Sequence, residues 1–522
     1  MIDNRTVMIQ GTGSDVGKSI LATALCRIFA RKNLKVAPFK SWNMSLNSYV
    51  TADGGEIGIA QAIQAQAAGI SPTVEMQPIL VKPRGKGLSQ IIIRGKAIGD
   101  RGHHKDKRYI NWALLKIRES LEKLRTEYDL VVIEGAGSPV ELNVKEQDLA
   151  NMKVAALFKT PVILVTDVDR GGALAALVGT LRLLEAEERD LVQGLIINRF
   201  RGDLDLLKPG VSFLEEYTGK PVLGVIPYIK DIRLPEEDAA SLQINNGIRP
   251  GQNLIKIGVI HLPHLANFTD FSALTLAPDV SLKYIKSAGE IAELDLIIIP
   301  GSKSTTTDLS HLKANGLADG ILQAAGRGVP VIGICGGYQM MGERLYDPDH
   351  TEGDYNQIDG LGLLAIETTF FKEKTTQQVR ARIKGEGLFF DGLKGEEIEG
   401  YEIHKGESSY LPNSAGQFNQ NKIPFMIRQR SRQRVRVEDG LISGDNLHFG
   451  TYLHGLFNND KFRNNLLNKL REQKGLPPLP ARSSYYRGLD ADYDQLAAIV
   501  AQHLRIDLIE QLLAQGVISD GC

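Results

Sequence analysis

The alternation of short apolar runs with helix-length segments constrains the fold of this chain more than any other feature. Within the first 230 or so residues the runs are "TVMIQG", "KVAPFK", "DLVVIEGAG", "PVILVTDV", "VQGLIINRF" and "PVLGVIPY". Runs of Val, Ile and Leu separated by helical segments predict a parallel sheet that is covered on both faces. The first part of the chain is therefore expected to be an α/β domain.

A second α/β series begins after a polar stretch rich in Pro, Gly and Asn at 234–253. Its apolar runs are "LIKIGVIHLP", "LDLIIIPGSKST" and "VPVIGICGGYQMMG", followed by antiparallel candidates "LGLLAIETTF", "QVRARIKG" and "IEGYEIHKGES". We expect domains at 1–233 and 254–522 with a linker at 234–253. Residues 411–434 are expected to form an exposed, mobile loop, and the helical tail 461–522 is expected to cap the second domain.

Length and composition agree with this organisation. A chain of 522 residues is too long for one core, and a formal net charge of −1 gives no global field for attracting nucleic acid or an anionic membrane. Its three cysteines are far apart, which excludes a disulfide framework. No apolar run reaches the ~18 residues that span a bilayer. These features predict a cytoplasmic protein without nucleic-acid or membrane partners.

The stretch "GTGSDVGKS" follows the first strand candidate and precedes the apolar segment "ILATALCRIF". A strand, a glycine loop and a helix in this order place backbone N–H groups and a helix N-terminus around phosphates. The predicted ATP-binding residues of this loop are Gly11, Thr12, Gly13, Ser14, Asp15, Val16, Gly17, Lys18 and Ser19. In this prediction Lys18 reaches the β- and γ-phosphates, and the Ser19 hydroxyl is a ligand of Mg²⁺.

Further polar residues follow other strand candidates, at the edge where open α/β sheets bind ligands. Glu134 ends "DLVVIE", where its carboxylate can reach a metal ion, and Asn198 ends another strand, where its amide can read a base edge. Asp53 and Glu56 stand at a predicted helix start. They are metal-ligand candidates there, although without the other motifs helix capping is the favoured interpretation.

The second chemical motif is Gly333-x-Cys335-x-Gly337, between a strand and a helix. Glycines at this spacing resemble a nucleophile elbow, and a helix N-terminus lowers the pKa of a thiol. Cys335 is therefore the candidate nucleophile, whereas Cys26 is expected to be a buried structural cysteine. Backbone N–H groups of Gly336 and of Gly301 and Ser302, in "PGSKST", are candidates for an oxyanion hole.

A thiol nucleophile needs a base, and His454 in "GTYLHGLF" is the leading candidate. Its competitors are His261, His264, His404 and His448.

Taken together, the motifs resemble known families. "GICGGYQMMG" with "GTYLHGLF" resembles the class I glutamine amidotransferases, and "GTGSDVGKS" with "EGAGSP" resembles the dethiobiotin-synthetase-like ATPases. In this order, with "NMSLNS", "NRFRGD", "NFTDFSAL" and "GYEIHKGES" between them, they resemble the cobyric acid synthase family from about residue 7 to 460. The loop is one residue longer than the usual phosphate loop, and Thr12 and Val16 match the variant that these ATPases carry.

The resemblance implies ATP- and glutamine-dependent amidation of the b, d, e and g carboxylates of adenosylcobyrinic acid a,c-diamide, giving adenosylcobyric acid in cobalamin biosynthesis. It implies an acyl phosphate in the first domain and ammonia released at Cys335 in the second. It also implies a Mg²⁺ site formed by Ser19, Glu56 (five residues before Gln61) and Glu134. Because the substrate carries several carboxylates, substrate-binding candidates near the ATP site are Lys40, Asp53, Lys82 and Arg84.

One departure from the full amidotransferase triad concerns the residue two positions after the histidine. Leu456 stands where those enzymes carry Glu, so the group that orients His454 is not identified. Two alternative functions also stay open: the sister synthase that amidates the a and c carboxylates, and a partitioning-type ATPase switch. The second lacks support from the loop, because Gly13 stands where those ATPases usually carry a second lysine.

Overall fold

The computed structural model describes residues 6–83, 88–102, 107–230, 232, 234–235, 254–412, 422–481 and 484–517. The chain divides into two compact units, each made of more than one segment. Unit 1 contains Met1–Ser45, Ile57–Leu234 and Leu489–Cys522, and unit 2 contains Leu46–Glu56 and Pro235–Gly488. No helix in the described ranges is both long enough and apolar enough to cross a membrane.

Unit 1 is built on a six-stranded parallel sheet of order β12-β11-β10-β1-β9-β2. Its strands are β1 (Thr6–Gly11), β2 (Val36–Phe39), β9 (Leu130–Glu134), β10 (Val162–Asp167), β11 (Val192–Phe200) and β12 (Val222–Pro227). These are the six runs predicted from the sequence, and the expected parallel α/β sheet is confirmed.

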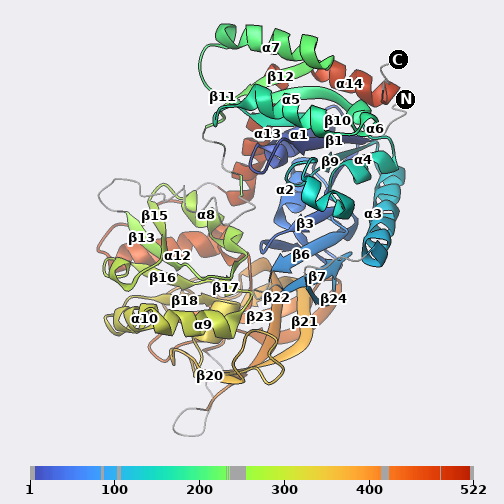
Figure 1. Cartoon of the computed structure of the whole chain (residues 1–522). Coiled ribbons are helices and arrows are strands. Elements are labelled where there is room, and N and C mark those ends of the chain that lie inside the picture. Colours follow the sequence, from blue (N-terminus) through green and yellow to red (C-terminus); the bar gives the residue numbers. More distant parts are fainter. Residues whose placement is uncertain are drawn as a thin grey trace. The chain divides into compact units, whose positions relative to one another are not determined.

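Helices flank this sheet (Figure 1). They are α1 (Lys18–Arg31), α2 (Ile59–Ala67), α3 (Lys107–Glu127), α4 (Met152–Leu157), α5 (Ala173–Leu183), α6 (Ala186–Leu191) and α7 (Leu204–Thr218). Successive residues of β1 enter different cores because strand side chains alternate between faces. Val7 and Ile9 pack with α1 residues such as Leu21, whereas Met8 packs with α3 residues such as Ile117.

The C-terminal tail corrects an expectation. The segment from 489 onward belongs to unit 1 and does not cap the second domain. Helices α13 (Tyr485–His503) and α14 (Ile506–Gln515) bury Val500 and Leu513 in the same core as Val7. The buried Arg27 of α1 donates to Asp490 at 2.8 Å and to Asp494 at 2.7 Å. The amphipathic pattern predicts the helices, but such a pattern does not say which core a helix covers.

Unit 1 also holds a four-stranded sheet, β3-β6-β7-β8, that was not predicted. Its strands are β3 (Trp42–Met44), β6 (Ile79–Pro83), β7 (Leu88–Ile93) and β8 (Lys96–Gly102).

Unit 2 contains a second sheet of order β15-β13-β16-β18-β26-β25, parallel except for its last strand. Helices α9 (Thr305–Ala314), α10 (Leu317–Gly326), α11 (Gly336–Met340) and α12 (Asp460–Gln473) accompany it (Figure 1). The strands are β13 (Ile255–Ile260), β15 (Val280–Ile285), β16 (Leu296–Ile299), β18 (Val331–Ile334), β25 (Leu441–Ile442) and β26 (Phe449–Thr451). The predicted second α/β domain is confirmed.

An antiparallel sheet completes unit 2, and it corrects two expectations. The predicted strands in "LGLLAIETTF" and "QVRARIKG" are one long strand, β21 (Ile366–Ile383), which pairs with β22 (Glu397–Tyr410). Within 411–434, β23 (Phe425–Arg430) and β24 (Gln433–Asp439) pair in a hairpin, so the expected loop is wrong there. Phe425, Met426 and Ile427 at the start of β23 are all buried. Residues 413–421 lie outside the described residues.

Segment 46–56 is the second departure from the expected domain boundaries, after the C-terminal tail. It lies early in the sequence, yet it belongs to unit 2. Predicting domains as continuous stretches could not reveal this excursion. Most of the predicted linker 234–253 lies outside the described residues, and only its first two residues are described.

Candidate active site

Cys335 stands on a sharp turn between β18 and α11. Its backbone has φ 53° and ψ −109°, a left-handed φ that is strained for a residue with a side chain. A Cβ on the neighbouring Gly337 would come 1.9 Å from the Ile299 carbonyl oxygen, so only glycine allows this approach. The backbone N–H of Cys335 donates to the Thr451 carbonyl at 2.8 Å. The structure thus places Cys335 on the kind of elbow that the glycine spacing predicted.

His454 lies beside this cysteine with a buried acidic partner. Its Nδ1 is 2.7 Å from Oδ2 of Asp270, and the N–H of Gly455 donates to Asp270 Oδ1 at 2.9 Å. The ring of His454 stacks on Tyr401, with centroids 5.0 Å apart. Asp270 is therefore the orienting group that the missing Glu at position 456 left open.

Sequence reasoning missed Asp270 as a functional residue. It lies in "NFTDFSAL", which served only as a resemblance motif. A lone Asp 184 residues before its histidine gives no spacing signal.

The electrostatics of the pair favour an ionised histidine. Burial opposes the charged imidazolium, but Asp270 and Cys335 outweigh it and raise the pKa of His454 to about 10. An imidazolium held beside a thiol stabilises the thiolate, which is the nucleophilic form of cysteine.

The predicted oxyanion residues lie close to this pair. A Cβ on Gly301 would come 3.2 Å from Cε1 of His454 and 3.9 Å from Cβ of Cys335. A Cβ on Gly336 would come 2.9 Å from the backbone N of Ser302. The Ser302 hydroxyl donates to Asp308 Oδ2 at 2.6 Å, which anchors this turn. The structure brings the three residues together, and their oxyanion role stays a prediction.

The other histidines have different surroundings. The imidazole of His264 is 2.8 Å from Asp308, and that hydrogen bond raises its pKa against the effect of burial. His448 Nδ1 accepts from the N–H of Val331 at 3.1 Å. The ring of His404 stacks on that of Tyr452, with centroids 3.8 Å apart. Burial lowers the pKa of His261. Among these five candidates, His454 is the histidine that lies beside Cys335, and Asp270 is its carboxylate partner.

The phosphate-binding loop of unit 1 joins β1 to α1, as predicted. Lys18 Nζ donates to the Gly13 carbonyl at 2.8 Å and to the Gly137 carbonyl at 3.1 Å, so it spans two glycine loops. Asn198 Nδ2 donates to the Val16 carbonyl at 2.8 Å. A Cβ on Gly17 would come 2.0 Å from that amide nitrogen. Asn198 thus supports the loop, and reading of a base edge stays a prediction.

Glu134 is the centre of a buried polar cluster next to this loop. Its Oε1 accepts from Ser19 Oγ at 2.8 Å and from Lys40 Nζ at 2.9 Å, and its Oε2 accepts from Gln64 Nε2 at 2.6 Å. Burial would raise the pKa of this carboxyl, but the Lys40 ammonium and the hydrogen bonds outweigh it and lower the pKa. Glu134 is therefore an anion. Two of the three predicted metal ligands, Ser19 and Glu134, are in contact.

The third predicted ligand, Glu56, has partners of its own. Its Oε2 forms an ion pair with Lys374, and its Oε1 accepts from Ser48 Oγ at 3.0 Å, all within unit 2. The exposed Asp53 lies in a local turn, where it accepts from the Thr51 hydroxyl, and it does not stand at a helix start. The proposed helix capping by Asp53 is thus wrong, and the substrate role of Asp53 stays a prediction.

Two of the remaining substrate candidates, Lys40 and Lys82, lie in unit 1. Lys40 is paired with Glu134 and Lys82 is buried in β6. Arg84 lies outside the described residues.

The donor set of unit 1 fits a hydrated metal ion bound with a nucleotide. Within the described ranges, no group of three or more His, Cys, Asp and Glu side chains is arranged to hold a metal. Gln61, however, is fully buried, and neither polar atom of its amide has a hydrogen-bond partner among the described residues. It lies one turn from Gln64 on the same face of α2. An unsatisfied buried amide one helical turn from Gln64, which donates to Glu134, is suited to a polar ligand.

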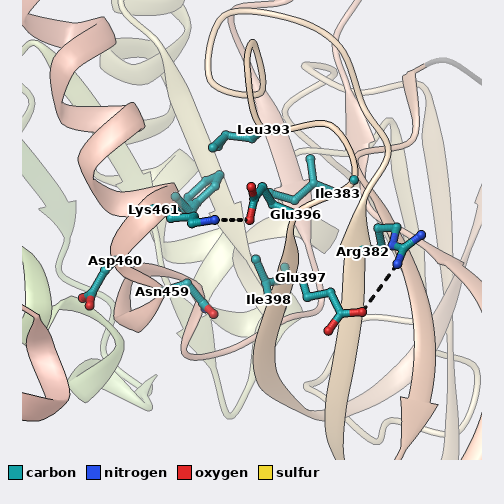
Figure 2. Close-up of a pocket in the computed structure, with 11 residues that line it drawn as sticks. Arg382, Ile383, Leu393, Glu396, Glu397, Ile398, Asn459, Asp460 and Lys461 are labelled. Carbon is teal, nitrogen blue, oxygen red and sulfur yellow. Dashed lines mark hydrogen bonds and ion pairs between the residues drawn. The ribbon is translucent and has the colours of Figure 1, made fainter. Parts of the chain in front are cut away.

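A separate cavity of about 470 Å³ in unit 2 is not part of this site (Figure 2). Two ion pairs satisfy charged groups of its lining, Lys461 with Glu396 at 2.7 Å and Arg382 with Glu397 at 3.6 Å. None of the predicted site residues lines it.

Comparison with known proteins agrees with the two α/β domains. Residues 7–242 match the family model of the CobQ/CobB/MinD/ParA nucleotide binding domain, and residues 256–462 match that of the CobB/CobQ-like glutamine amidotransferase domain. The fold and the sites therefore define a glutamine-dependent amidoligase, in which a P-loop ATP-binding domain is fused to a glutamine amidotransferase domain.

Full-length relatives narrow the class. The chain is 48% identical to a cobyric acid synthase of Moorella thermoacetica, over 98% of this chain and 97% of the relative. It is 47% identical to one of Pelotomaculum thermopropionicum, over 98% and 96%. A third, from Desulforamulus reducens, is 46% identical over 98% of each chain. The chain belongs to the cobyric acid synthase family.

Proposed function

We propose that this chain converts adenosylcobyrinic acid a,c-diamide into adenosylcobyric acid by amidating the b, d, e and g carboxylates. ATP activates each carboxylate and glutamine supplies the nitrogen. The observation that carries the nitrogen source is the Cys335–His454–Asp270 arrangement, with His454 Nδ1 2.7 Å from Asp270. The choice of substrate is supported by the cobyric acid synthases that this chain matches over nearly their whole length.

In the glutaminase half, the Cys335 thiolate attacks the side-chain amide carbon of glutamine. The N–H groups of the Gly301–Ser302 turn and of Gly336 stabilise the oxyanion that develops. His454 then donates its proton to the leaving nitrogen, and ammonia departs from a glutamyl thioester. Water deprotonated by His454 hydrolyses the thioester and frees the thiol. Asp270 holds the ring in position and stabilises the imidazolium throughout.

In the synthetase half, a corrinoid carboxylate oxygen attacks the γ-phosphorus of ATP, and ADP leaves. Ammonia attacks the resulting acyl phosphate, phosphate leaves, and an amide forms. Lys18 and the loop N–H groups stabilise the transferring phosphoryl group. When Mg²⁺ is bound, Ser19 and Glu134 would hold it, and it supplies charge neutralisation of the phosphates. Glu56 stays a proposed third ligand.

A small cavity supports a place for the corrinoid carboxylate. It measures about 250 Å³, lies within unit 1 and follows the strand that carries Glu134. Its lining includes Trp42, Ser138 and Lys145, and also the acidic residues Glu141 and Asp148. An apolar ring and loop polar groups suit the edge of a large macrocycle that presents carboxylates.

Mass spectrometry of the corrinoid after incubation with ATP and glutamine tests the proposal. Four added amides support it. Two amides on cobyrinic acid would identify the sister synthase, and no amidation would contradict an amidoligase.

Two variants separate the halves. Cys335→Ala should abolish amidation from glutamine and retain amidation from ammonia, because ammonia enters after the thioester step. Lys18→Ala should abolish amidation from both sources while retaining glutaminase activity. Loss of ammonia-dependent amidation in correctly folded Cys335→Ala would refute this division.

A further inference from the structure

Asn267 contacts the catalytic histidine and has no role in the mechanism above. It is 2% exposed and adopts a left-handed backbone, with φ 54° and ψ 42°. Its Nδ2 lies 3.5 Å from Nε2 of His454. This is the ring nitrogen opposite the one that faces Asp270, so it is the nitrogen that exchanges a proton with the thiol.

A backbone group fixes which end of the Asn267 amide faces the histidine. The N–H of Ser48 donates to Oδ1 of Asn267 at 2.9 Å. A backbone N–H only donates, so the accepting atom must be the amide oxygen. The hydrogen-bond network thus assigns the amide orientation, and the NH₂ group is left facing Nε2.

An NH₂ group that faces Nε2 favours one protonation state of the ring. It donates to the lone pair of neutral His454, and it opposes a proton on the same nitrogen. The other titratable groups that face this ring are Asp270, Cys335 and the stacked Tyr401. Asp270 and a Cys335 thiolate favour the imidazolium, whereas burial and the Asn267 amide oppose it. Asp270 and Cys335 outweigh burial and favour the imidazolium, and the Asn267 amide reduces that preference.

We propose that Asn267 is a positioning residue that restrains formation of the His454 imidazolium–Cys335 thiolate pair, and that the Ser48 backbone N–H sets this restraint by orienting its amide. The inference rests on the glutaminase half of the proposed function.

The anchor of this restraint belongs to segment 46–56. Ser48 also donates through Oγ to Glu56, and Glu56 pairs with Lys374 of β21. A second contact links the same two loops, because Thr269 Oγ1 donates to Asn47 Oδ1 at 3.3 Å. Segment 46–56 thus contacts Asn267, which in turn contacts His454. The second contact of this segment is with Thr269.

The test measures the rate of Cys335 alkylation by iodoacetamide against pH in the full-length enzyme. Thiolate is the reacting form, so the acid limb of the profile reports formation of the ion pair. Asn267→Ala removes one hydrogen-bond donor that opposes the imidazolium, so the midpoint of the acid limb should move to lower pH by about one unit. At a given pH on this limb, the thiolate fraction and the alkylation rate should rise about tenfold. Asn267→Asp should shift it in the same direction and further, because its carboxylate accepts from protonated Nε2.

Matched controls keep the result specific. Asp tolerates the left-handed backbone and can still accept from Ser48, so Asn267→Asp serves where Asn267→Ala does not fold. Thr269→Val removes the neighbouring contact between the same loops and should leave the profile unchanged. An unchanged or raised limb in Asn267→Asp would overturn the proposal, as would an equal shift in Thr269→Val. Cys335→Ala gives the background alkylation, and four added amides by the wild-type enzyme test the proposed function separately.

Discussion

Asp270→Asn is the most direct test of the catalytic arrangement. Its oxygen would be retained by the N–H of Gly455, which donates at 2.9 Å to Oδ1. The amide NH₂ then faces Nδ1 of His454, where the carboxylate accepted at 2.7 Å. Nδ1 must now accept, so the single ring proton moves to Nε2 and no lone pair faces the thiol. Asp270→Asn thus selects the wrong tautomer while the shape of the site is kept.

The size of the effect follows from the hydrogen bond that is lost. A hydrogen bond to a charged group contributes about 1.5–3 kcal/mol, and each 1.36 kcal/mol changes a rate about tenfold. Glutaminase activity should therefore fall by about 10-fold to 150-fold, and further to the extent that the tautomer is locked. Loss of the Asp270 charge should also lower the pKa of His454 from about 10.

The assay compares amidation from glutamine with amidation from ammonia in the same preparation. Glutamine-dependent turnover should fall, while ammonia-dependent turnover and the thermal unfolding midpoint should change little. Glutaminase activity equal to wild type would refute the assignment of Asp270. A parallel loss of both activities would indicate that Asp270 is needed for folding and not for orienting His454.

Three further perturbations test other parts of the structure. Glu134→Gln should destabilise unit 1 by about 3–5 kcal/mol and abolish amidation from both nitrogen sources, because Lys40 loses its buried carboxylate partner; thermal unfolding and amidation assays check this. Burial first, and then Glu402, raise the pKa of Asp439 to about 7. The protonated carboxyl therefore contributes its full stabilisation below the ordinary carboxyl pKa of 3.8, and this stabilisation is lost as pH rises through 7. Asp439→Asn should therefore reduce the fall in unfolding free energy between pH 5 and pH 8, and an identical pH dependence would contradict the assignment. Leu513→Ala should cost about 2–5 kcal/mol of unfolding free energy, since its side chain is fully buried in the core of unit 1.

The sequence predicted the elements whose signals are local. The strand of Glu134, the loop of Lys18 and the elbow of Cys335 each depend on residues within one strand–turn–helix unit, so spacing alone located them. The same reasoning predicted the nucleotide sheet, because fully buried parallel strands carry unbroken apolar runs.

The rest depends on contacts between residues far apart in the chain. Asp270 and His454 are separated by 184 positions, and the Asn267–Ser48 contact by 219. An amphipathic pattern also fixes a helix but not its partner, which is why α13 and α14 were assigned to the wrong core. The carboxylate of Glu56 forms an ion pair with Lys374, which its motif could not predict, and its role as a metal ligand stays a prediction.

The placement of α13 and α14 has a consequence for synthesis on the ribosome. Arg27 meets Asp494 across 467 positions. At about 5–20 residues per second, roughly 25 to 90 seconds separate translation of the two. During that interval the face of α1 that those helices later cover stays exposed on the nascent chain. The first residues to emerge thus complete their core only with the last, so a chaperone that shields apolar helix faces would act on this protein for most of its synthesis.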